Sequence, residues 1–213
     1  LDAYGMGMLA KEISMEMDIE TIKAQAVIVR TGIYKKMTEQ KEGEELVFTD
    51  HFYTVDEMEK EWKSHMQEYY EKLSKAWNET KERILVYEDH PAYTPYCRLT
   101  NGKTRDAKEA LGTDQYPYLK SVDLSEDKDA EDAFQSKEID GTGDEITKQD
   151  SAGYVLEIRQ GEETMDGDTF RDRWELASSC YTLKEENKKT TVITQGIGHG
   201  LGMSQNMAES MAK

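Results

Sequence analysis

The chain opens with LDAYGMGMLAKEISMEMDIETIKAQAVIVRT, residues Leu1–Thr31, and this stretch decides how the first part of the molecule folds. Apolar residues at helical spacing in its first eight positions predict a first helix. A break follows at residues 14–18, and Asp18 is placed to cap a second helix. Beyond Asp18, apolar residues return at three- and four-residue steps on one face: Ile19, Ile22, Ala26, Val29, Ile33 and Met37. This pattern predicts an amphipathic helix.

The rest of the chain mixes helical and extended patterns. Residues 39–50 look like a loop, and the aromatic and methionine stripe of residues 58–77 predicts a long helix whose stripe is core packing rather than a cofactor site. Short runs rich in β-branched and aromatic residues predict strands at 84–88, 93–97, 154–158 and 190–194, with helices near 170–176 and from 204 to the end. We therefore expect the α+β class: one mixed α and β domain over residues 1–213.

The charge of the chain narrows the classes of partner. Its 213 residues carry a net charge of -17, with 37% hydrophobic and 33% charged residues. Nucleic acid is disfavoured as a partner because phosphates require a basic surface, and an anionic membrane surface is disfavoured for the same reason. A neutral or weakly charged substrate such as a glycan is compatible with this surface.

An acidic stretch covers residues 121–150. It holds eleven acidic and three basic residues, a net charge of -8, and few large apolar residues. We interpret it as a solvated surface insertion or a mobile loop. Calcium binding is a sharper alternative, but the carboxylates lack the EF-hand spacing. We predict no metal and no cofactor.

The two cysteines, Cys97 and Cys180, leave two alternatives open. They form one disulfide in an oxidising compartment, or they are a pair of buried free thiols. His90 lies seven residues before Cys97, but a zinc site needs two further ligands, and the sequence has no CxxC or HxxxH spacing.

Near the C-terminus, GIGHGLGMSQ (Gly196–Gln205) surrounds His199 with glycines. Glycine permits backbone conformations closed to other residues and lets another segment or a ligand approach closely. A tight turn whose histidine has a structural role explains the pattern as well as a binding site does. The stretch is not a dinucleotide or P-loop motif, and the GxSxG motif of serine hydrolases is missing.

Glu12 lies among apolar residues at the end of the first predicted helix. A carboxyl in apolar surroundings has a raised pKa and can act as a general acid near neutral pH. An exposed glutamate at a helix end is the simpler interpretation from spacing alone.

Together these stretches resemble the stage II sporulation protein D (SpoIID/LytB) family. Residues Leu1–Thr31 are similar to its opening motif, with Lys11-Glu12, then KAQAV at Lys23–Val27, then Arg30-Thr31. GHGLGMSQ at Gly198–Gln205 resembles the closing motif. NGKT (Asn101–Thr104) and YPYLKSV (Tyr116–Val122) fall between them in the expected order, so the resemblance spans nearly the whole chain.

The resemblance implies a lytic transglycosylase. Such enzymes cut peptidoglycan strands free of stem peptides between N-acetylmuramic acid and N-acetylglucosamine, leaving 1,6-anhydromuramic ends without adding water. It implies a substrate groove, with an inserted long helix and the acidic insertion as additions. The catalytic residues it implies are Glu12, Arg30 and Tyr118. The substrate-binding residues it implies are Lys23, Gln25, Thr104, His199, Ser204 and Gln205. For Lys23 and Arg30, substrate contact and holding the Glu12 carboxyl are both open.

The resemblance also implies an extracytoplasmic location, a membrane anchor through an N-terminal segment outside this sequence, and a peptidoglycan amidase as a partner. Asn206, Met207 and Ala208 stand where the family's closing motif continues with an aromatic residue and Gly-Ala. A glycan-binding module without catalysis, which modulates a partner amidase or autolysin, is therefore an alternative function. A surface protein with a purely structural role is a third.

Overall fold

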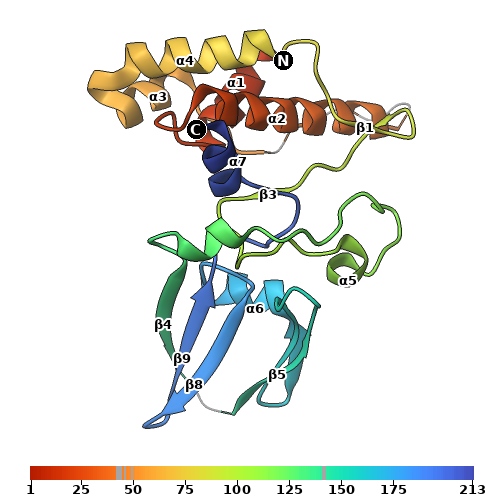
Figure 1. Cartoon of the computed structure of the whole chain (residues 1–213), viewed down its shortest axis with the longest axis vertical. Coiled ribbons are helices and arrows are strands. Elements are labelled where there is room, and N and C mark those ends of the chain that lie inside the picture. The colour runs from red at the N-terminus through yellow and green to blue at the C-terminus, as the bar shows by residue number, and fades with distance from the viewer. Residues whose placement is uncertain (42–44, 46, 49, 141–142) are drawn as a thin grey trace. The chain divides into compact units, whose positions relative to one another are not determined.

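The computed structural model describes residues 1–41, 45, 47–48, 50–140 and 143–213 (Figure 1). The chain divides into two compact units: unit 1 comprises Leu1–Thr94 and Ala208–Lys213, and unit 2 comprises Pro95–Met207. Helices and strands are both present, so the predicted α+β class is confirmed. The sequence did not indicate a boundary near Thr94.

Unit 1 contains four α-helices where the apolar spacing predicted three, because the long helix predicted over residues 58–77 is divided in two. They are α1 (Asp2–Glu12), α2 (Ile19–Glu39), α3 (Val55–Trp62) and α4 (Met66–Glu79), with a 3₁₀ turn between the last two. Asp18 caps α2 as expected, accepting a hydrogen bond of 2.8 Å from the amide of Glu20. The predicted loop at residues 39–50 lies partly outside the described residues.

The core of unit 1 forms where α1, α2 and α4 pack together. Leu9, Ile22 and Leu73 are fully buried, and Trp77 is nearly so. The prediction that the stripe of residues 58–77 is core packing is confirmed, because Met58, Trp62, Leu73 and Trp77 all belong to this cluster. A short hairpin, β1 (Val86–Tyr87) and β2 (His90–Pro91), ends the helical part, and only β1 falls within the predicted strand at 84–88.

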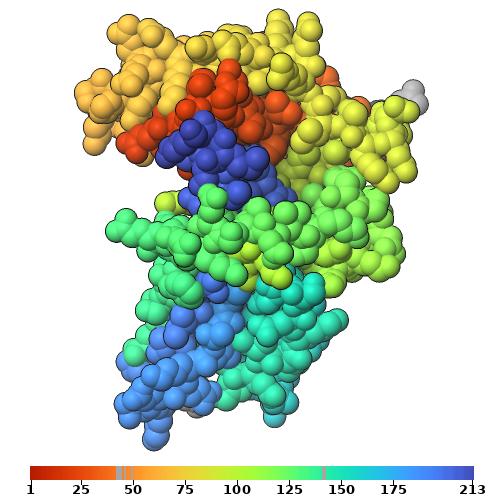
Figure 2. All heavy atoms as spheres, in the orientation of Figure 1, coloured from red at the N-terminus to blue at the C-terminus, as the bar shows by residue number. Residues whose placement is uncertain are grey.

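The last residues of the chain belong to unit 1. The carboxylate of Glu209 accepts hydrogen bonds from the Asp18 amide at 2.7 Å and from the Thr21 hydroxyl at 2.9 Å. Figure 2 shows the dark blue C-terminal end packed against the red N-terminal helices. These bonds attach the helix α7 (Gln205–Ala212) to the start of α2.

Unit 2 contains two antiparallel three-stranded sheets. One has the order β4 (Phe134–Asp140), β9 (Lys189–Gln195), β8 (Tyr181–Glu186), and the other has the order β5 (Asp144–Gln149), β6 (Val155–Gln160), β7 (Glu163–Asp166). The helix α6 (Gly167–Arg173) packs with them around an apolar core. The core consists mainly of Ile139, Val155, Ile158, Met165, Phe170, Leu176, Tyr181 and Val192.

Three smaller elements of unit 2 lie within or close to the motifs. The strand β3 (Tyr96–Cys97) pairs in parallel with β10 (Met203–Ser204), which joins the glycine-rich segment to the chain just before NGKT. The helix α5 (Ala107–Leu111) begins after Arg105 and Asp106, the two residues that follow NGKT. The strands predicted at 154–158 and 190–194, and the helix near 170–176, correspond to β6, β9 and α6.

The interpretation of residues 121–150 as a mobile loop was wrong. This stretch contains a 3₁₀ turn at Ser125–Asp129 and the strands β4 and β5, and β4 pairs with β9 over seven residues. The sequence did not predict β4 because most of its side chains are exposed and polar. Only Ile139 of this strand is buried, so the strand has no alternating apolar pattern. The solvated interpretation holds for most of the side chains, although Asp127 is fully buried.

Candidate active site

Glu12 is the last residue of α1, and its half-buried carboxylate contacts α2. The Oε2 atom accepts a hydrogen bond of 3.0 Å from Nε2 of Gln25, whose side chain is fully buried. Leu9 and Ile13 beside Glu12 are buried in the core. The fold of unit 1 therefore brings the glutamate of the opening motif against the glutamine of KAQAV.

Lys23 points to other carboxylates. Its Nζ lies 2.7 Å from an oxygen of Glu20 and 2.7 Å from an oxygen of Glu79 at the end of α4. Hydrogen bonds to these two groups raise the pKa of Lys23. These contacts hold the amine between α2 and α4.

Arg30 is buried between α2 and the C-terminal end of α4. Its Nη1 donates to the carbonyl of Thr80 at 2.6 Å and to the Thr80 hydroxyl at 3.0 Å, and its Nη2 donates to the carbonyl of Trp77 at 2.8 Å. The guanidinium lies 4.0 Å from the centre of the Trp77 ring. A cation at carbonyls that end a helix is favourable. These contacts indicate a positioning role, and the predicted catalytic role stays a prediction.

Unit 2 joins the two middle motifs of the sequence. The buried Thr104 hydroxyl donates to the carbonyl of Lys120 at 3.0 Å and accepts from the amide of Val122 at 2.8 Å. Thr104 thus fixes the segment that carries Tyr118. The half-buried Tyr118 ring lies edge-on to that of Tyr116, with 6.3 Å between their centres.

The glycines around His199 allow close approach within unit 2. Gly200 has a φ of +75°, and a Cβ there would lie 2.2 Å from the Tyr154 ring. Gly202 has a φ of +74°, and a Cβ there would lie 1.9 Å from the carbonyl oxygen of Pro95. Side chains rarely adopt this backbone region, and neither site has room for one. The segment can therefore lie directly on its neighbours.

His199 itself is half-buried, with its ring held by the backbone. The amide of Leu201 donates to Nδ1 at 3.0 Å, so the neutral ring carries its hydrogen on Nε2. Burial lowers the pKa of His199, the nearby Asp168 opposes this shift, and Arg171 and Arg105 add to it. The imidazole is therefore neutral at pH 7.

The two residues after the glycines begin the last helix. The buried Ser204 hydroxyl accepts from the amide of Met207 at 3.2 Å, which caps α7, and the buried Gln205 is its first residue. Ser204 therefore has a structural role in addition to the predicted substrate contact. Its position in β10, opposite Cys97, places it beside the segment that leads to NGKT.

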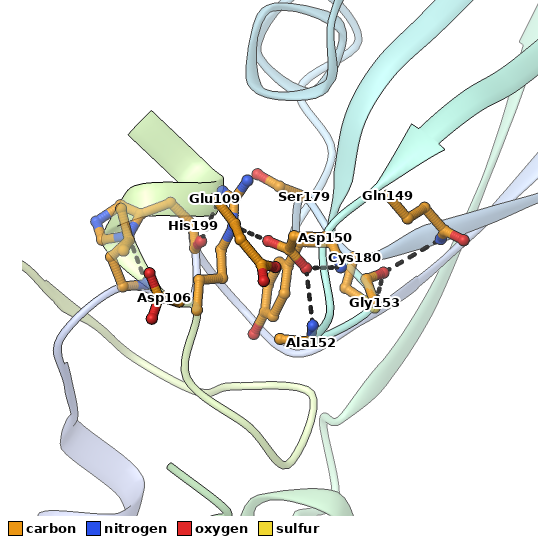
Figure 3. Close-up of polar contacts among 12 residues, drawn as sticks. Asp106, Glu109, Gln149, Asp150, Ala152, Gly153, Ser179, Cys180 and His199 are labelled. Carbon is orange, nitrogen blue, oxygen red and sulfur yellow. Dashed lines mark hydrogen bonds and ion pairs between the residues drawn. The ribbon is translucent and has the colours of Figure 1, made fainter. Parts of the chain in front are cut away.

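Sequence reasoning missed Arg105, which directly follows NGKT. This fully buried arginine binds Asp150 through Nε at 2.6 Å and Asp168 through Nη1 at 3.1 Å. Figure 3 shows Asp150, Ser179 and His199 in this region. The partners of Arg105 are 45 and 63 residues away in the chain, and no local pattern marks them.

Both cysteines are free thiols in the structure, as in the second of the two alternatives, but only Cys97 is buried, whereas Cys180 is half-buried. Burial raises the pKa of Cys97 to about 12 and also raises the pKa of Cys180. Neither thiol is therefore an effective nucleophile at pH 7.

Within the described part of the chain, no group of three His, Cys, Asp or Glu side chains is placed to hold a metal ion. Among the same residues, no helix is long and apolar enough to cross a membrane.

These features define an α+β protein with a helical unit that holds a half-buried glutamate and a β-rich unit that holds a glycine-framed histidine. A family model described as "Stage II sporulation protein" (SpoIID) matches residues 1–87. Stage II sporulation protein D of Bacillus amyloliquefaciens and that of Bacillus subtilis are each 30% identical to the chain over 236 aligned residues, covering the whole chain and 68% of the relative. An uncharacterized protein of Brachyspira hyodysenteriae is 27% identical, over the whole chain and 61% of its own length. The chain belongs to the stage II sporulation protein D family.

Proposed function

We propose that this protein is a lytic transglycosylase that cleaves peptidoglycan strands free of stem peptides between N-acetylmuramic acid and N-acetylglucosamine. The observation that carries the proposal is the contact between Glu12 and Gln25, because it places the glutamate of the opening motif at a half-buried helix end with a defined orientation. Membership of the sporulation protein D family supports it. The location of such a substrate makes the protein extracytoplasmic, and an amidase that strips stem peptides is the expected partner.

A single carboxyl group can perform the whole reaction. Protonated Glu12 donates its proton to the glycosidic oxygen as the bond from that oxygen to C1 of the muramic residue breaks. The resulting carboxylate then takes the proton of the C6 hydroxyl as its oxygen bonds to C1. Glu12 ends protonated, and the products are a 1,6-anhydro end and a free 4-hydroxyl. Because the hydroxyl replaces water, the second carboxylate of ordinary glycosidases is not required.

Gln25 sets which oxygen of Glu12 carries the proton. An oxygen that accepts from an amide N–H is the one without the hydrogen, so protonated Glu12 carries its hydrogen on Oε1. The amide of Gln25 is neutral, so it orients the carboxyl without the strong preference for the ionised form that a cation would impose. A general acid needs this balance near neutral pH.

The other residues predicted from the resemblance have different roles in the proposal. Arg30 holds α2 against α4 and thereby supports the helix that carries Gln25. Tyr118 offers an aromatic face on which a sugar ring can pack. In unit 1, Lys23 is proposed to contact the glycan. In unit 2, Thr104, His199, Ser204 and Gln205 are proposed to bind the glycan or to shape the surface that binds it, Thr104 and Ser204 through the backbone that they hold.

The experiment that tests the proposal compares wild type with Glu12→Gln on peptide-free glycan strands, with the products read by mass spectrometry. Glu16→Gln is the matched control, because Glu16 is an exposed glutamate four residues away. We expect anhydromuramic ends from wild type and from Glu16→Gln, and a loss of at least about 100-fold in Glu12→Gln. Equal turnover in Glu12→Gln would contradict the assigned mechanism. Binding without cleavage by wild type would favour the glycan-binding module that modulates a partner amidase.

A further inference from the structure

Arg105 connects three segments of unit 2 that are distant in sequence. Its Nε donates to Oδ2 of Asp150 at 2.6 Å, and its Nη1 donates both to Oδ2 of Asp168 at 3.1 Å and to the carbonyl oxygen of His199 at 3.2 Å. The guanidinium also lies 5.2 Å from the centre of the Tyr154 ring. One buried cation thus holds the end of β5, the start of α6 and the glycine-rich segment.

Asp150, the main partner of Arg105, is itself fixed by the backbone. Its Oδ1 accepts from the amides of Ala152 at 3.1 Å and Tyr154 at 2.9 Å, while Oδ2 accepts from Arg105. Figure 3 shows the contact between Asp150 and Ala152. The carboxylate is fully buried in this arrangement. A buried ion pair with its remaining lone pairs satisfied has a unique geometry, and the guanidinium cannot move without breaking several bonds.

The backbone of Arg105 reinforces what its side chain does. The Arg105 amide donates to the carbonyl oxygen of Gly200 at 2.8 Å, next to the His199 carbonyl bound by the side chain. Two successive peptide planes of the segment are therefore held by one residue. Between them lies the φ of Gly200, at +75°. This turn also brings the Leu201 amide to Nδ1 of His199.

We propose that Arg105 is a positioning residue for His199: it fixes the peptide planes on both sides of Gly200, so that the imidazole accepts at Nδ1 and offers Nε2–H as a donor. Only the identity of the ligand in this inference rests on the proposed function. The Nε2–H group is a donor that suits the hydroxyl and acetamido oxygens of a glycan. Lysine cannot replace Arg105, because one ammonium cannot span Asp150, Asp168 and the His199 carbonyl.

Asp127 provides a matched comparison on the same segment. This fully buried carboxylate accepts from the Thr100 amide at 2.9 Å and hydroxyl at 2.6 Å, and from Nδ2 of Asn206 at 3.0 Å. It therefore holds the far end of the segment, beyond Gln205. Asp127→Asn disturbs a buried polar cluster of unit 2 without touching His199, so it separates loss of stability from loss of positioning.

The first test is the tautomer of His199, measured by long-range ¹H–¹⁵N spectra of the labelled full chain. We expect wild type and Asp127→Asn to show the Nε2–H form. In Arg105→Lys the Leu201 amide is no longer held at Nδ1 of the ring. We expect the ratio of the Nε2–H to the Nδ1–H tautomer to fall by roughly fivefold, which corresponds to the loss of one hydrogen bond. Of the charged groups that act on the ring, Asp168 and Arg171 are unchanged in every variant, and Arg105→Lys keeps a positive charge at position 105. An unchanged tautomer in folded Arg105→Lys, or an equal change in Asp127→Asn, would overturn the inference.

The second test is a double-mutant cycle with Arg105→Lys and His199→Ala, measured on peptide-free glycan strands. We expect each single change to raise KM by about tenfold with kcat nearly retained, and the double variant to be no worse than either. Additive losses would show that Arg105 does not act through His199. If wild type neither cleaves nor binds the strands, the proposed function is wrong, while the tautomer measurement still decides the role of Arg105.

Discussion

The two units hold their candidate site residues by different means. In unit 1, Glu12 lies at the end of a helix whose other face is apolar core, and the neutral amide of Gln25 orients it. In unit 2, His199 lies in a glycine-rich segment held by the buried ion pair of Arg105 and Asp150, with the partly exposed Asp168 as a further partner of Arg105. A general acid benefits from a donor such as an amide that orients its carboxyl without a full charge, whereas a fixed donor benefits from a rigid polar frame.

The largest effect on stability is expected from Arg30→Met, which tests whether unit 1 also depends on a buried cation. The change removes the three hydrogen bonds that the guanidinium donates to the carbonyls of Trp77 and Thr80 and to the Thr80 hydroxyl. We expect a loss of about 4 kcal/mol in the free energy of unfolding, because hydrogen bonds from a charged donor contribute about 1.5 kcal/mol each. Urea denaturation followed by helical circular dichroism measures it. Arg83→Met, at an exposed arginine of the same unit, is the control. Equal stability of the two variants would show that apolar packing alone holds unit 1.

Gly200→Ala tests the close approach in unit 2. The new Cβ overlaps the Tyr154 ring and requires an unfavourable φ, so we expect a loss of about 3 kcal/mol. Gly112→Ala is the matched control, because Gly112 has a φ of +66° with nothing within 4 Å of the added Cβ. It should lose only about 1 kcal/mol, the cost of backbone strain. If both variants lose the same amount in thermal unfolding, the contact with Tyr154 has no part in the role of Gly200.

The smallest expected effect is on how the free energy of unfolding depends on pH, and it is due to His199. Burial places the pKa of folded His199 below its unfolded value of about 6.5, so between these two values the unfolded chain binds more protons. Stability therefore falls as the pH drops below about 6.5. His199→Gln should reduce this loss, as measured by urea denaturation at about pH 7 and about pH 5.5. In unit 1, Asp2 has a pKa lowered by its hydrogen bond from Trp77, and it titrates at more acidic pH. If His199→Gln and wild type lose the same free energy of unfolding between these two pH values, His199 is not held in its neutral form by the fold.

The same comparison explains what the sequence could predict. The positions of α1 and α2 follow from apolar spacing, and the Asp18 cap is local, so these features were predicted. The 3₁₀ turn that separates α3 from α4 was not predicted, because the apolar spacing continues across it. The resemblance placed Glu12 and Gln25 in one motif, and their contact agrees with it. The partners of Arg105 lie far along the chain and share no periodicity with it, so local patterns could not reveal them. The strand β4 was not predicted because most of its side chains face solvent.

The most direct test of the central claim is cleavage of peptide-free glycan strands in H₂¹⁸O. If Glu12 serves as both acid and base and the C6 hydroxyl attacks C1, the new muramic ends are anhydro forms that contain no ¹⁸O. Incorporation of one ¹⁸O at each new reducing end would mean that water attacks, and that Glu12 acts with a second carboxylate as in an ordinary hydrolase.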